Sequence, residues 1–176
     1  VTEIGGLSLG PIVSALRMLE RDGLVVNTPG MGASVRKWTA KEIVHLYHIR
    51  AVHEGLAARL CVEEATATDL AAIVIANEAF QASIDAGDTE ANIRADIDFH
   101  TAVVKGSHCP DLERASENLS LMHCSMRAFG ISRNLPQVLV QDLRLAQERK
   151  PAHSPIVHAI VARDAAAAEA AGRKHV

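Results

Sequence analysis

The sequence Ala95-Asp96-Ile97-Asp98-Phe99-His100 places a carboxylate and an imidazole four residues apart. In an α-helix, Asp96 and His100 lie one turn apart on the same face, and Phe99 points to a neighbouring face where it can be buried. A carboxylate and an imidazole held side by side on a rigid helix make half of a metal site. The stretch therefore predicts a helix that carries two metal ligands, and the other two must come from elsewhere in the chain.

A second pair of histidines lies in the C-terminal segment from His153 to His175. Apolar residues recur there with helical spacing, and Arg163-Asp164 indicates a break before a second, Ala-rich helix. Each histidine lies eleven residues from Asp164. In an antiparallel helix hairpin folded at Asp164, both would stand about 16 Å from the turn, at roughly 1.5 Å rise per residue. They are therefore expected to be level with each other on adjacent helices.

The two pairs together supply three nitrogens and one oxygen, from Asp96, His100, His153 and His175. Such a set suits a divalent transition metal such as zinc, nickel or manganese, with positions open for water or ligand oxygens. The alternative is chance, because the chain has nine histidines and D-x-x-x-H on a helix is a weak signal. Under that alternative each histidine is an ordinary half-buried or solvated residue.

Composition narrows the class of protein. The 176 residues can hold one full core, or a core plus a small appendage. Apolar residues make up 48% but aromatic residues only 3%, which favours closely packed helices over a sandwich or barrel. A net charge of −3 argues against chain-wide affinity for nucleic acid, although not against a local basic patch. Three cysteines without C-x-x-C spacing, no signal peptide and no membrane-spanning run indicate a protein of the reducing cytoplasm.

The first 37 residues predict a helix followed directly by a small hairpin. Ser8 is a natural N-cap, Pro11 is tolerated in the first helical turn, and Asp22-Gly23 stops the helix. Gly5-Gly6 would be the turn that precedes this helix.

The hairpin is predicted from strands at 24–27 and 33–36 with a turn at 29–32. A capped helix followed by such a hairpin is typical of the end of a winged helix-turn-helix, where the helix enters the major groove and the hairpin is the wing. Residues 1–37 are therefore expected to be a DNA-binding module that is N-terminally incomplete.

Residues 38–176 predict an all-α domain of about six helices with no strand. A capping box at Thr39 and Glu42 opens a long helix that runs to about Glu64. The further expected elements are helices from Thr68-Asp69 to about Ala86, from Asp88 to about Gly106 and from Cys109-Pro110 to about Gly130, a connection at 134–136, a region of uncertain structure at 138–150, and the final hairpin. The predicted fold is mainly α, a partial winged helix-turn-helix followed by a six-helix antiparallel bundle.

Several motifs occur in an order typical of one family. They are Leu7-Ser8-x-Gly10-Pro11-Ile12 with Gly23-Leu24-Val25, then Leu46-Tyr47-x-Ile49-Arg50-x-x-x-Glu54, Asp96-x-x-Phe99-His100, His153-x-x-Ile156 and Arg173-Lys174-His175. Together they resemble the GntR superfamily of bacterial transcription regulators, in the FadR-type branch with a C-terminal FCD ligand domain. The part after the wing resembles the six-helix, VanR-like variety.

The resemblance implies a homodimeric sensor whose helices surround a pocket. Its metal-binding members hold the ion with one Asp and three His, which match Asp96, His100, His153 and His175. A small organic acid then binds beside or onto the metal. Arg50 matches the arginine that faces its carboxylate, since a guanidinium can hold a carboxylate bidentately. The structural alternative for Arg50 is an ion pair with Glu54, one turn along.

The resemblance also implies further contact residues. Candidate contacts to operator DNA are Ser8, Gly10, Pro11, Arg17, Arg21, Gly32 and Arg36. His123 and Arg127, at i and i+4, are candidates for lining the effector pocket, with a surface position as the alternative. The remaining histidines are interpreted as ordinary residues, namely His45, His48, His53, His108 and His158.

Two departures from the family pattern bear on these expectations. Leu9 and Val13 stand where the recognition helix usually has arginines, and Gly5 replaces an expected Leu. Without charge to neutralise phosphates, affinity for DNA falls. Pro155 is acceptable only if His153 lies at the very start of its helix.

The sequence thus predicts a ligand-responsive DNA-binding regulator and not an enzyme, with operator DNA, a small carboxylate effector and a second copy of the chain as partners. One alternative is a helical metalloenzyme that uses a metal-bound water, although no further general acid or base is evident beside the four ligands. Another is a degenerate sensor that binds ligand and dimerises but, given Leu9 and Val13, no longer binds DNA.

Overall fold

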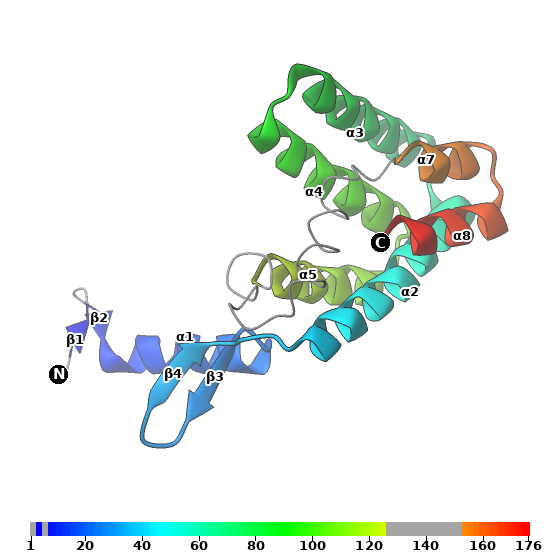
Figure 1. Cartoon of the computed structure of the whole chain (residues 1–176). Coiled ribbons are helices and arrows are strands. Elements are labelled where there is room, and N and C mark those ends of the chain that lie inside the picture. The colour runs from blue at the N-terminus through cyan, green and yellow to red at the C-terminus, as the bar shows by residue number, and fades with distance from the viewer. Residues whose placement is uncertain (1–2, 5–6, 126–152) are drawn as a thin grey trace. The chain divides into compact units, whose positions relative to one another are not determined.

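The computed structural model describes residues 3–4, 7–125 and 153–176 (Figure 1). These residues form seven α-helices and four short strands, so the chain is mainly α, as predicted. They divide into two compact units, one from the described residues of 1–44 and 117–145, the other from those of 45–116 and 146–176. No described helix is both long enough and apolar enough to cross a membrane.

The first unit begins with a two-stranded hairpin and a helix. Strand β1 (Glu3–Ile4) pairs antiparallel with β2 (Leu7–Ser8), and α1 (Leu9–Arg21) starts directly after it. Ser8 occupies the predicted N-cap position, but its side chain makes no capping hydrogen bond, and its backbone pairs with Glu3 instead. The predicted turn at Gly5-Gly6 lies outside the described residues.

The predicted wing is a hairpin of β3 (Val25–Thr28) and β4 (Gly32–Val35). Each strand reaches one residue further toward the turn than predicted, because Thr28 pairs with Gly32. Gly32 has φ +82°, a backbone conformation that glycine adopts easily and other residues rarely do. The hairpin therefore depends on a glycine at this position.

Arg36 connects the hairpin to the start of α2 (Ala40–Glu64). Its Nη2 donates to Glu42 Oε1 at 2.6 Å, and its guanidinium lies 4.0 Å over the ring of buried Trp38. Glu42 also accepts a hydrogen bond from the Thr39 backbone at 2.8 Å, which forms the predicted capping box. The bonds from the Thr39 backbone and from Arg36 lower the pKa of Glu42 to about 2, so the carboxylate stays charged.

In the second unit, α3 (Ala67–Ala86) and α4 (Thr89–Gly106) lie side by side (Figure 1). The predicted cap at Thr68-Asp69 is wrong, because Thr66 begins α3 and Asp69 occupies the third helical position. Asp69 N donates to Thr66 Oγ1 at 3.2 Å, and Asp69 Oδ2 accepts from Thr66 N at 2.9 Å. This reciprocal pair satisfies two backbone donors at once, which a cap at Thr68 would not do.

The ends of α3 and α4 agree with the prediction. Gly87, with φ +68°, ends α3 in the left-handed conformation common at helix C-termini. Asp88 then caps α4 by accepting hydrogen bonds from the backbone of Glu90 and Ala91, each at 3.0 Å. Two residues therefore suffice to reverse the chain between the two helices.

Three further helices are described, namely α5 (Pro110–Ser125), α7 (Ser154–Val161) and α8 (Ala165–His175). The break predicted at Arg163-Asp164 is present, since Asp164 caps α8 by accepting from Ala167 N at 2.9 Å. The expected end of α5 near Gly130, the connection at 134–136 and the uncertain region at 138–150 lie outside the described residues.

The core of the second unit is made of small and branched side chains from several helices. Its largest fully buried members are Phe99, Ile73, Ile160 and Cys61, together with one polar residue, His153. His53 is also buried, with Nε2 3.1 Å from Leu112 O, which joins α2 to α5. His53 thus has a hydrogen-bond partner, and His153 is the other histidine ring buried in this core.

We predict that Thr66→Ala lowers the free energy of unfolding by about 1 kcal/mol, because it removes the side chain that caps α3. Thr68→Ala, at an exposed position in the same first turn, should change it by less than about 0.5 kcal/mol. Urea unfolding of the two variants measures the difference. Equal destabilisation by both substitutions would contradict the assignment of the cap to Thr66.

Candidate metal centre

Helix α4 presents Asp96 and His100 on one face, as the sequence predicts. His100 Nε2 lies 3.8 Å from Asp96 Oδ1. Phe99 is fully buried and anchors this part of the helix in the core. The His100 side chain is 16% exposed and that of Asp96 36%, so the pair lies where the core meets the surface.

His153 lies at the N-cap of α7 and is buried. Pro155 stands within the first turn of α7, where a backbone N–H would have no intrahelical acceptor. His153 therefore lies at the very start of its helix, as Pro155 requires. The His153 ring stacks on Phe99, with centroids 3.9 Å apart at 15°, and contacts Phe80 at 4.1 Å. Aromatic contacts therefore hold the ring, and neither of its nitrogens makes a well-aligned hydrogen bond within the described residues.

Helix α8 packs against α2 through two glycines. A Cβ on Gly172 would lie 2.8 Å from Glu54 O and 3.0 Å from Gly55 Cα. A Cβ on Gly55 would in turn lie 2.9 Å from Glu169 O. These distances are too short for any side chain, so the two backbones approach this closely only because both positions are glycine.

The close packing brings His175, the last residue of α8, into the cluster. Its Nε2 lies 3.2 Å from His100 Nε2, and its ring centroid lies 4.8 Å from that of His153. The predicted placement of His153 and His175 at the same height on adjacent helices is therefore observed.

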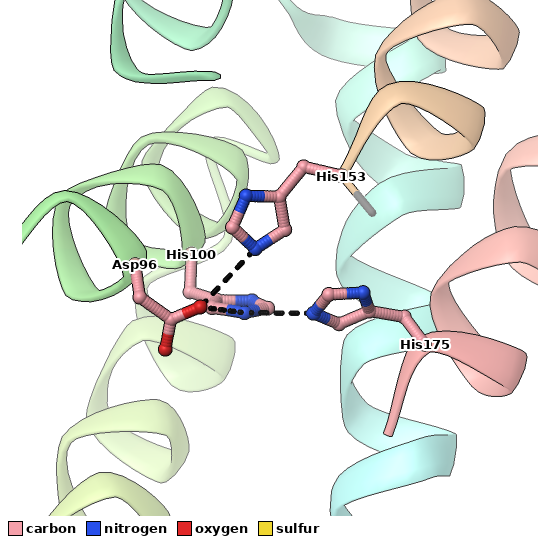
Figure 2. A group of neighbouring side chains, drawn as sticks. All are labelled: Asp96, His100, His153 and His175. Atoms are coloured by element: carbon pink, nitrogen blue, oxygen red, sulfur yellow. Dashed lines mark hydrogen bonds and ion pairs between the residues drawn. The ribbon is translucent and has the colours of Figure 1, made fainter. Parts of the chain in front are cut away.

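Figure 2 shows the four side chains pointing toward a common point from α4, the start of α7 and the end of α8. One ligand atom from each lies within 4.8 Å of the others, in the group Asp96, His100, His153 and His175. His153 Nε2 is 3.2 Å from Asp96 Oδ1, equal to the distance between the Nε2 atoms of His100 and His175. Adjacent ligands with bonds of about 2.1 Å stand about 3.4 Å apart around a tetrahedral ion and about 3.0 Å apart around an octahedral one, which leaves open positions beside four protein ligands. These two donor pairs therefore have a spacing that suits a small divalent ion, and the remaining pairs lie within 4.8 Å.

Burial and the neighbouring carboxylates together decide the charge of the three imidazoles. It lowers the pKa of His153 and that of His175, in the second case to about 3, with the neighbouring His100 adding to the effect. Burial also opposes protonation of His100, but the carboxylates of Glu54 and Asp96 outweigh it and raise the pKa of that ring. Two imidazoles are therefore neutral and offer lone pairs, and an incoming cation would displace the proton of the third.

Glu54 lies beside this cluster, although its sequence position indicated only a pairing with Arg50. His100 Nδ1 donates to Glu54 Oε2 at 2.8 Å, and Glu54 Oε1 lies 3.5 Å from Arg50 Nη2. Burial acts to raise the pKa of Glu54, but His100 and Arg50 outweigh it and lower the pKa to about 2. The Arg50-x-x-x-Glu54 spacing was visible in the sequence, whereas the contact with α4 was not.

Of the three candidate effector residues, the structure describes Arg50 and His123 but not Arg127. The ion pair between Arg50 and Glu54, which was the structural alternative for Arg50, is present, and the Arg50 side chain is only 16% exposed. His123 is half-buried on α5, and Arg127 lies outside the described residues. The histidines interpreted as ordinary lie outside the cluster: His53 and His108 are bonded to Leu112 and Asp69, and His45, His48 and His158 are exposed.

The candidate DNA contacts lie in the first unit. No residue of α1 is buried, and Arg17 and Arg21 are exposed on it, as are Leu9 and Val13. Ser8, Gly10, Pro11 and Gly32 are exposed as well. Arg36 differs from the others because its guanidinium is bonded to Glu42 and stacked on Trp38.

Residues 45–176 match the family described as the FCD domain. The chain is 32% identical over 149 residues to the HTH-type transcriptional regulator YdhC of Bacillus subtilis, covering 82% of this chain and 66% of that protein. It is 30% identical over 172 residues to a D-xylose utilization operon transcriptional repressor of Paenarthrobacter nicotinovorans, covering 97% and 71%.

Among solved structures, the chain is similar to E. coli McbR/YncC, with a TM-score of 0.69 and 23% identity, covering 97% of this chain and 77% of that one. This last likeness shows the fold alone. The chain spans about two thirds of YdhC and somewhat more of the other two proteins. The two sequence relatives are named as transcription regulators and not as enzymes, in agreement with the prediction from sequence.

We predict that Gly172→Ala destabilises the protein by about 1–3 kcal/mol, because the new Cβ would meet the α2 backbone. Helix propensity alone would give the opposite sign, a gain of up to about 1 kcal/mol. Ala170→Gly, at an exposed position of α8, is the matched control and should cost about 1 kcal/mol through propensity alone. A Gly172→Ala protein more stable than wild type in urea would contradict the close approach of α8 to α2.

Proposed function

Because the chain belongs to the FCD family of GntR-type transcription regulators, we propose that it is a ligand-responsive regulator that binds operator DNA and senses a small organic acid with the help of a metal ion. In this proposal, residues 1–37 form the DNA-binding module and residues 38–176 form the effector and dimerisation domain. The function is regulatory, so the metal serves binding and not catalysis.

The convergence of four ligand atoms within 4.8 Å carries the proposal. Asp96, His100, His153 and His175 would hold a divalent transition metal, with zinc, nickel and manganese as the candidates given three nitrogens and one oxygen. The ion would supply a local positive charge and open positions that attract a carboxylate. His153 supports this assignment most directly, since its buried ring nitrogens lack aligned partners within the described residues.

The effector residue we propose is Arg50. Its guanidinium is charged, mostly buried and bonded through Glu54 to the ligand His100. A carboxylate could therefore be held by the ion on one side and by the guanidinium on the other. His123 and Arg127 remain proposed neighbours of this pocket on the grounds of sequence alone.

The DNA-binding part of the proposal rests on the family and on exposed residues of the first unit. Arg17 and Arg21 on α1 would contact phosphates, the start of α1 at Ser8, Gly10 and Pro11 would face the groove, and Gly32 and Arg36 would belong to the wing. Leu9 and Val13 bring no positive charge, so affinity should be modest and should fall less steeply with salt than in a regulator with arginines there.

We propose that the protein acts as a homodimer. In support, α2 exposes Ile49, Val52 and Leu56, which stand at i, i+3 and i+7 and so form one apolar face. A dimer would present two DNA-binding modules to a palindromic site. Ligand would then change operator affinity to the extent that it binds two states of the dimer unequally.

The metal site predicts about one zinc ion per chain after incubation with zinc and desalting. The double variant His153→Ala/His175→Ala should lose the ion, because only Asp96 and His100 would remain. His158→Ala, at an exposed position of the same α7, should keep it and serves as the control. Metal analysis by mass spectrometry decides, and full retention of zinc by the double variant would refute the site.

The effector role predicts that Arg50→Ala keeps zinc but binds small carboxylates about 10–100-fold more weakly, as expected for losing a hydrogen bond to a charged group. Calorimetry of the zinc-loaded protein with a panel of mono- and dicarboxylic acids measures this. Gel shifts on the upstream region of its own gene, at about 50 mM and about 200 mM salt, test operator binding. Ligand binding without any shift would favour the degenerate sensor over the regulator.

A further inference from the structure

Glu54 lies between the metal cluster and the proposed effector residue. Its side chain is 12% exposed and projects from the middle of α2. One carboxylate oxygen accepts a hydrogen bond from His100 Nδ1 at 2.8 Å, and the other lies 3.5 Å from Arg50 Nη2. Both oxygens are therefore engaged, each with a different part of the site.

The bond to Glu54 decides which nitrogen of His100 faces the centre. A neutral imidazole has one N–H and one lone pair, and the partner of the first fixes the position of the second. With Nδ1 donating to Glu54, the lone pair resides on Nε2. That atom is the one that lies 3.2 Å from His175 Nε2 and 3.8 Å from Asp96 Oδ1 (Figure 2).

The three histidine ligands differ in how they are held. His153 is clamped by the rings of Phe99 and Phe80, and His175 is positioned by the glycine contact of α8. The His100 ring meets Phe99 only edge-on, at 5.5 Å and 78° between centroids and planes. The rings of His153 and His175 also lie beside it, with centroids at 5.2 and 4.9 Å, but neither is stacked on it as Phe99 is on His153. The hydrogen bond to Glu54 is therefore the contact that distinguishes the two nitrogens of His100.

We infer that Glu54 is a positioning residue of the metal centre, which sets the tautomer and orientation of His100 and holds Arg50 beside it. The inference rests on the proposed function, since it concerns the same site. A carboxylate that accepts from a ligating histidine also makes the imidazole a stronger donor. Glu54 touches neither the ion nor the effector in this account, and it acts through His100 and Arg50.

The test compares zinc affinity in wild type, Glu54→Ala, Glu54→Gln and Glu63→Gln, by competition with a chromophoric chelator. Glu63 lies on the same helix, forms an exposed ion pair with Arg59 and is the matched control. Glu54→Ala should weaken zinc binding about 10–100-fold. Glu54→Gln should weaken it less, because an amide oxygen accepts the same bond without the charge. Glu63→Gln should bind like wild type.

A second measurement reports on orientation rather than on affinity. In ¹⁵N-edited NMR spectra of the zinc-loaded protein, the His100 Nδ1–H proton should exchange slowly in wild type and in Glu63→Gln. The signal should be lost by rapid exchange in Glu54→Ala and be retained, although shifted, in Glu54→Gln. A role for Glu54 in stability alone would not move this proton between the two Glu54 variants.

The outcomes separate the inference from the proposed function. Wild-type affinity in both Glu54 variants, with zinc still lost from His153→Ala/His175→Ala, would overturn the role of Glu54 and leave the metal centre standing. Failure of the wild-type protein to bind zinc, nickel or manganese would overturn the metal centre itself. If circular dichroism shows that Glu54→Ala does not fold, Glu54→Gln decides, and an affinity equal to that of Glu63→Gln overturns the inference.

Discussion

The close approach of α8 to α2 at Gly55 and Gly172 is the contact on which the rest of the candidate site depends. A helix is rigid over its few turns, so fixing α8 at Gly172 also fixes His175, three residues further along. The same contact involves the carbonyl oxygen of Glu54, the residue before Gly55. One backbone contact thus positions groups on both sides of His100, with His175 facing its Nε2 and Glu54 facing its Nδ1.

Around His100, the negative charge of Glu54 is balanced by Arg50 and His100, and all three side chains are largely buried. Glu54 stays ionised although it is buried, because His100 and Arg50 stand beside it. His153 has no such arrangement, since aromatic rings surround it and its nitrogens lack aligned partners within the described residues. An unpaired polar group in a core costs stability. The Asp96 carboxylate at 3.2 Å is the polar group nearest to His153 Nε2, and a cation at the proposed site would lie between the two.

In the first unit, the charged side chains of α1 are exposed to solvent and not buried in a cluster. Helix α1 has no buried residue and exposes Leu9 and Val13 beside Arg17 and Arg21. In the wing, Arg36 is already bonded to Glu42 and stacked on Trp38, so part of its charge is neutralised within the protein. If this unit binds DNA as we propose, Arg17 and Arg21 supply the positive charge of α1, since Leu9 and Val13 supply none. The first unit therefore exposes apolar and basic side chains together, whereas the second unit gathers its ionisable groups in a largely buried cluster.

Helix boundaries could be predicted from the sequence because capping is local. Thr39, Asp88 and Asp164 each satisfy backbone donors within three residues, and all three caps are present. The wrong cap predicted for α3 has the same origin. Thr68 directly precedes Asp69 and Thr66 lies three residues before it, so both are possible N-caps, and only the reciprocal hydrogen bonds between Thr66 and Asp69 distinguish them. The i, i+4 relation of Asp96 and His100 is likewise a property of one helix.

What the sequence by itself determined, then, was the mainly α fold, the ends of most helices, and the pairing of candidate ligands along single helices and across one short hairpin. Only the tertiary structure decided that Glu54 turns its carboxylate to His100 and that two phenylalanines enclose His153. It also decided that two glycines bring α8 onto α2. The reason is physical: hydrogen bonds within a turn depend on neighbours in sequence, whereas these contacts join residues far apart in the chain, and helical packing sets their distances.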